Sequence, residues 1–152
     1  MTSQNLCSLS QKRCWGLLFL TLMIAVMILF LLYTSEDPRW SSNYWVHWLS
    51  SHFHLNPHLA ATFVNGLRKT LHFTGYGCFG LILWGYFFLW QLKKPLIWGL
   101  LGVLLIAILD EYTQSFATFR FGKAGDVLLD FLGAVVFTGI IKIFFRVHQN
   151  IS

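Results

Sequence analysis

The side chains best suited to chemistry are four carboxylates at the ends of apolar stretches. Asp110, Glu111, Asp126 and Asp130 make up four of the six acidic residues in the chain. Asp126 and Asp130 are spaced i, i+4 and therefore share one face of a helix, and Asp110 shares a face with Gln114 in the same way. Carboxylates at such positions can transfer protons, bind cations or anchor an ion-pair network.

A third polar stripe lies earlier in the chain. Lys69, His72 and Tyr76 are spaced i, i+3 and i+7, which places them along one face of a helix. The cations near the carboxylates in sequence are Arg68, Lys69, Arg120 and Lys123. We expect the three stripes to converge, with Arg120 folded over them and at least one carboxylate within about 4 Å of a cation.

Two interpretations of this polar cluster remain open. Ionisable residues inside a membrane usually mark a ligand or substrate site. A buried ion-pair network that only fixes the register of the helices is the alternative. A metal site is weakly indicated, because His72 and the carboxylates show no HExxH-type or Cys/His spacing, so we predict neither a metal nor a cofactor.

The composition indicates the elements that hold these residues. Hydrophobic residues make up 56% of the chain and charged residues only 11%, against about a quarter charged in soluble domains. A soluble globule is thereby excluded, and we expect an all-α integral membrane bundle of four transmembrane helices in a single domain, 1–152. The expected spans are 14–33, 69–92, 96–115 and 126–146.

Basic residues predict the orientation of these spans. The clusters flanking the apolar stretches are Lys12-Arg13, Lys93-Lys94 and Lys142 with Arg146. By the positive-inside rule they place both termini in the cytoplasm, and they form no basic stripe for nucleic acid. The first outer loop, 34–68, contains Trp40, Trp45 and Trp48, and we expect an amphipathic interfacial segment there.

Glycines within the spans predict close contacts between helices. These positions are Gly75, Gly77, Gly80, Gly99, Gly102, Gly133 and Gly139.

Two motifs resemble those of the VanZ-like membrane proteins. The stretch from Arg68 to Tyr76 resembles the family's RKxxHFxEY motif, with Gly75 where the family usually has Glu. The stretch 110–133 resembles its DExxQxFxPxRxGxxxDVxxDxxG signature, with Thr118 in the segment where a proline is common. The resemblance covers about residues 66–139 and implies a multi-pass protein of the bacterial inner membrane.

The family is named for a protein associated with resistance to the glycopeptide teicoplanin, and the resemblance implies an envelope function. We expect a polar outer-leaflet site for an anionic amphiphile, either a lipid-linked wall precursor or a lipoglycopeptide antibiotic, with Arg68, Lys69 and Arg120 holding the anionic group. The alternative is a membrane enzyme acting on a lipid ester or phosphate, with Asp110 or Glu111 and His72 as acid and base.

Overall fold

The computed structural model describes residues 3–36, 39, 41–116 and 124–151, and these residues form α-helices without any strand. The helices are α1 (Ser3–Glu36), α2 (Ser42–Phe53), α3 (Pro57–Leu89), α4 (Pro95–Phe116) and α5 (Ala124–Ile151). The all-α prediction is therefore confirmed.

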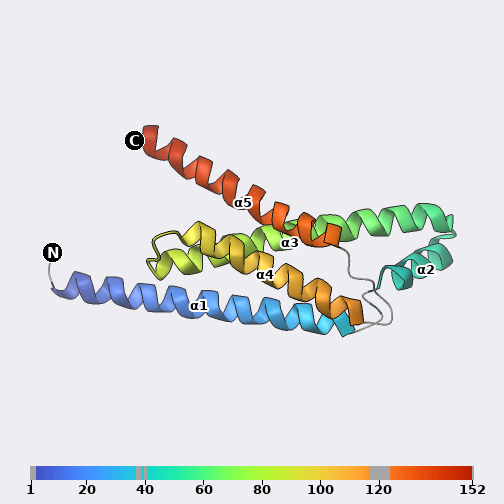
Figure 1. Cartoon of the computed structure of the whole chain (residues 1–152), viewed down its shortest axis with the longest axis horizontal. Coiled ribbons are helices and arrows are strands. Elements are labelled where there is room, and N and C mark those ends of the chain that lie inside the picture. Colours follow the sequence, from blue (N-terminus) through green and yellow to red (C-terminus); the bar gives the residue numbers. More distant parts are fainter. Residues whose placement is uncertain (1–2, 37–38, 40, 117–123, 152) are drawn as a thin grey trace.

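The four long helices form a bundle whose two ends differ (Figure 1). The turn between α3 and α4 and both chain termini lie at one end, which we call the terminal end. The last turns of α4, the first turns of α5 and the short helix α2 lie at the other end, which we call the α2 end. The helix α3 packs most extensively with α5, then with α4, and also contacts α1 and α2.

Capping residues explain where the helices at the α2 end begin. Ser41 precedes α2, and its Oγ accepts a hydrogen bond from the Tyr44 N–H at 3.2 Å. Asn56 precedes α3, and its Oδ1 accepts from the His58 N–H at 2.9 Å, while Pro57 occupies the first turn. This cap starts α3 twelve residues before the expected span 69–92, so the first turns of α3 lie beside α2.

In the part of the chain that the structure describes, three helices are long and apolar enough to cross a membrane, namely those containing Arg13–Phe30, Pro95–Phe116 and Ala124–Arg146. They agree with the expected spans 14–33, 96–115 and 126–146. The helix α3 is not among them, because its second half interleaves Gly, Trp and Tyr with aliphatic residues and these lower its mean hydropathy. No residue of the stretch Arg13–Phe30 is buried, so this face of the bundle requires an apolar solvent.

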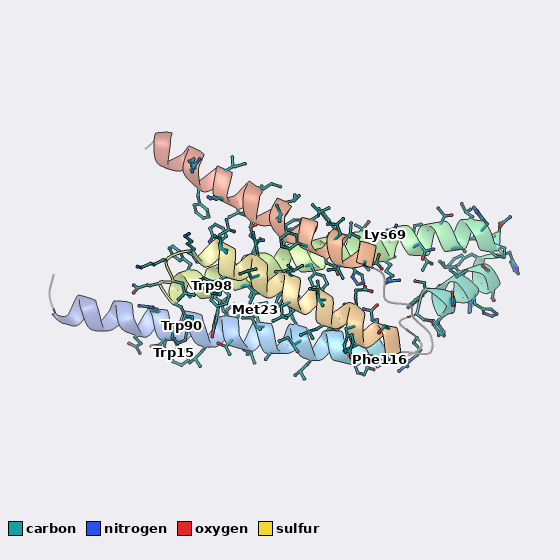
Figure 2. The ribbon with its side chains drawn as sticks, viewed as in Figure 1. Trp15, Met23, Lys69, Trp90, Trp98 and Phe116 are labelled. Atoms are coloured by element: carbon teal, nitrogen blue, oxygen red, sulfur yellow. The ribbon has the colours of Figure 1, made fainter. Side chains whose placement is uncertain are left out.

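Exposed tryptophans form a belt near the terminal end. Trp15 on α1, Trp98 on α4 and Trp90 just after α3 lie at a similar level along the bundle (Figure 2), and all three are exposed. Tryptophan favours the boundary between hydrocarbon and water, and Lys93 and Lys94 lie between Trp90 and Trp98 in the chain. The belt therefore fits a membrane surface at the terminal end.

Small residues bring α3 close to α5. A Cβ at Gly133 would collide with the backbone carbonyl of Phe73, and one at Gly80 would lie 2.9 Å from the Ala134 Cβ. The predicted close contacts at these two positions are confirmed, as are those at Gly77, Gly99 and Gly102. The predictions for Gly75 and Gly139 are wrong, because a Cβ at either position would meet no heavy atom within 4 Å.

Candidate functional site

Two side chains of α3 contact carboxylates of α5 at the α2 end. Arg68 Nη2 donates to Asp126 Oδ2 at 2.8 Å. One turn later, His72 Nδ1 lies 3.2 Å from Asp130 Oδ1 and 3.4 Å from Asp130 Oδ2. If Asp130 is ionised, its carboxylate can only accept hydrogen bonds, and Nδ1 is then the donor in this contact. Arg68 and His72 are four residues apart on α3, and Asp126 and Asp130 are four residues apart on α5. Because the spacing is equal, both contacts can form between the two helices at the same time.

A third contact joins α3 to α4. The Tyr76 hydroxyl donates to Asp110 Oδ2 at 3.1 Å, and the rings of Tyr76 and His72 stack with centroids 6.1 Å apart. Glu111 and Gln114, which follow Asp110 on α4, are also buried. We refer to Arg68–Asp126, His72–Asp130 and Tyr76–Asp110 as the polar pairs.

The structure brings together most, but not all, of the residues expected in the site. Lys69, expected on the inward stripe with His72 and Tyr76, is exposed instead. Arg68 continues the stripe in its place, because positions 68, 72 and 76 are spaced i, i+4 and i+8. Arg120 lies outside the described residues, so its expected position over the cluster stays a prediction.

Burial makes the polar pairs energetically demanding. The side chain of Asp130 has an exposed fraction of 0%, and that of His72 18%. Removing a carboxylate from water is costly unless hydrogen bonds replace the lost hydration. The structure supplies a donor to each paired carboxylate, so the pairs fix the relative register of α3, α4 and α5.

A cavity of about 600 Å³ opens beside the polar pairs. Its walls come from α1, α2, α3 and α4 and are mainly apolar or aromatic. Trp45 and Trp48 of α2 and Phe63 of α3 line it, and we call these three residues the aromatic wall. The volume lies in the range of ligand sites, roughly 300–1,000 Å³.

The cavity reaches the donor side of two polar pairs. Among the described residues, Arg68 and His72 line it, whereas their partners Asp126 and Asp130 do not. The carboxylates therefore orient the guanidinium and the imidazole from behind. From α4, Asp110 and Gln114 complete the polar lining.

Sequence reasoning missed the cavity-lining role of several residues. Trp45 and Trp48 were expected to contact lipid headgroups, and Gly75 was expected to contact another helix. The structure assigns all three to the cavity wall, together with Met27 and Phe30 of α1. A helical spacing of aromatic residues in α2 was the available signal, but it does not reveal which neighbour the face packs against.

In the described part of the chain, no group of three or more His, Cys, Asp or Glu side chains is arranged to hold a metal ion.

Comparison with known proteins identifies one family. The family model described as VanZ/LLP1 matches residues 17–145, which is most of the 152-residue chain. No curated protein and no solved structure matches the chain.

Proposed function

The chain belongs to the VanZ/LLP1 family, and on this premise we propose that it is a membrane protein that binds an anionic amphiphile in the cavity beneath α2. The observation that carries the proposal is that Arg68 and His72 turn toward the cavity while Asp126 and Asp130 stay behind them. A mainly apolar cavity with hydrogen-bond donors at Arg68 and His72 suits a ligand with an anionic head and an apolar chain.

Arg68 is the head-binding residue in this proposal. Among the described residues, Arg68 donates one side-chain hydrogen bond, to Asp126 at 2.8 Å. A guanidinium has five N–H donors in a planar fork. The remaining donors suit a phosphate or carboxylate head. A lipid-linked wall precursor and a lipoglycopeptide such as teicoplanin both combine such a group with a hydrocarbon chain.

We further propose that α3 is a fourth transmembrane helix, which gives a bacterial inner-membrane protein with both termini in the cytoplasm. The helix has 33 residues, about 50 Å at 1.5 Å per residue, and it lies within the bundle between α4 and α5 (Figure 1). The basic clusters accompany the terminal end, and the aromatic helix α2 then lies at the outer surface.

Cysteine labelling tests this topology. In a variant whose native Cys7, Cys14 and Cys78 are replaced by serine, Asn43→Cys on α2 is expected to react with a membrane-impermeant maleimide in intact cells. Lys94→Cys is expected to react only after the cells are permeabilised, because it follows α3 at the terminal end. Labelling of both positions from the same side would contradict a membrane crossing by α3.

Ligand binding tests the role of Arg68. We expect Arg68→Gln to weaken binding of phosphatidylglycerol to the purified protein at least about tenfold, because hydrogen bonds to charged groups contribute roughly 1.5–3 kcal/mol. Native mass spectrometry at several lipid concentrations measures the affinity, and a polyprenyl phosphate and teicoplanin serve as further probes.

Lys69→Gln is the matched control for Arg68→Gln. It removes the same charge from the adjacent position, which is exposed and does not line the cavity. Equal losses in the two variants would mean that general surface charge attracts the lipid, and the proposed head site would then be wrong.

The His72–Asp130 contact favours one alternative, a membrane enzyme acting on a lipid ester or phosphate. A carboxylate that orients an imidazole beside a cavity is an arrangement used in acid–base catalysis. In this alternative His72 is paired with Asp130, whereas Asp110, one of the two carboxylates expected from the sequence, bonds to Tyr76. Time-dependent products from the same lipids, absent with His72→Phe, would favour the enzyme over the binding protein.

A further inference from the structure

The cavity continues along α3 on both sides of the polar pairs. Its lining on this helix extends from Phe63 to Phe79, a distance of about 24 Å along the axis. Arg68 and His72 lie in the middle of this length, and the aromatic wall lies on the α2 side of them. On the other side, toward the middle of the bundle, the lining on α3 extends to Phe79, and Met27 of α1 also lines the cavity.

The passage between these two parts runs past Gly75. This residue lines the cavity, and it lies three positions after His72 and four before Phe79, on the same face of α3. A Cβ at position 75 would meet no heavy atom within 4 Å. None of the described helices packs against this glycine, so the absence of a side chain here leaves open space inside the cavity.

We propose that Gly75 is a specificity-determining residue, which lets the hydrocarbon chain of the ligand pass the polar pairs and lie against Phe79 and Met27. The inference rests on the proposed binding function and adds the path of the chain to it. The head then lies at Arg68 and His72, and the chain extends toward the centre of the membrane. The ligand class is an anionic lipid with a long chain, since Phe79 lies about 16 Å along the helix from Arg68.

Two phosphatidylglycerols that differ only in chain length test this path. One carries sixteen-carbon chains, and the other carries four-carbon chains that end before Phe79. We expect Gly75→Leu to weaken binding of the long-chain lipid at least about tenfold, because an added side chain overfills the passage. Binding of the short-chain lipid is expected to stay within about twofold of the unsubstituted protein, since its head contacts are unchanged.

Gly66→Leu is the matched control, and Gly75→Ala is the graded variant. Gly66 lies on the same helix and is also surrounded by open space, but it does not line the cavity. Its leucine variant is expected to bind both lipids normally, whereas Gly75→Ala is expected to lose less long-chain affinity than Gly75→Leu. Because leucine and alanine favour helix more than glycine does, the variants are expected to fold.

The possible results separate this inference from the function on which it rests. Normal long-chain binding by Gly75→Leu, or equal loss of both lipids, overturns the role of Gly75 while leaving the head site in place. If the unsubstituted protein binds neither lipid, the proposed function itself fails and the chain path falls with it.

Discussion

Gly133→Ala is expected to destabilise the protein by about 3 kcal/mol or more, a large effect for one added methyl group. The new Cβ would collide with the carbonyl oxygen of Phe73 and would lie 3.0 Å from its carbonyl carbon and 3.2 Å from its Cα. Backbone atoms of a helix cannot rotate away as a side chain can. The helices α3 and α5 must therefore move apart, and the contacts of Arg68 and His72 with α5 lengthen.

Thermal unfolding of the detergent-solubilised protein, followed by the loss of monodisperse material, measures this effect. Gly139→Ala is the control, because it introduces the same change in the same helix at a position with no heavy atom within 4 Å of the new Cβ. It is expected to be neutral or to stabilise by up to about 1 kcal/mol through helix propensity. Equal melting temperatures for the two variants would show that the close approach of α5 to Phe73 is not required.

Asp130→Leu is expected to cost about 3–5 kcal/mol, and a second substitution is expected to recover most of that loss. The Asp130 side chain has no exposed surface, and its removal leaves the His72 Nδ1 without the acceptor described here. Loss of one member of a buried polar pair is far more costly than replacement of both. The double variant His72→Phe with Asp130→Leu is therefore expected to melt close to the unsubstituted protein.

The double variant also distinguishes a binding site from a structural network. If His72 contacts the ligand, the variant folds but binds phosphatidylglycerol at least about tenfold more weakly. Full recovery of both folding and lipid binding would assign the His72–Asp130 contact to packing alone. Melting temperature and native mass spectrometry on the same preparation give both measurements.

Spacing in the sequence was sufficient to predict most, but not all, of the polar residues that face inward. Because Asp126 and Asp130 are spaced i, i+4 and the chain carries few charges, these carboxylates were expected to find partners within the bundle. The Arg68–Asp126 distance of 2.8 Å lies within the predicted limit of about 4 Å. The same reasoning chose Lys69 over Arg68 for the stripe. Both residues lie within reach of that face in a helix, and only the position of α5 decides between them.

The cavity could not be predicted from periodicity. Its walls come from α1, α2, α3 and α4, which meet only in the folded chain. Trp45 and Trp48 are compatible with a lipid surface and with a cavity wall, because both environments favour aromatic rings. Gly75 was ambiguous for a related reason, since glycine serves equally where helices touch and where space must remain open. At Gly75 the departure from the resembled motif, which has Glu, coincides with the open passage.

The packing of α3 against α5 has a consequence for how the protein is made. A ribosome delivers the helices in chain order. In the proposed four-span topology, α3 therefore enters the membrane before α5. During that interval Arg68 and His72 are without Asp126 and Asp130, the carboxylates that they contact in the finished bundle. The helix α5, which is translated after α3, supplies these carboxylates and also Gly133, whose lack of a side chain allows the close approach to Phe73. Insertion and site formation are thereby separated in time, and the polar face of α3 must remain in contact with water or the insertion machinery until α5 arrives.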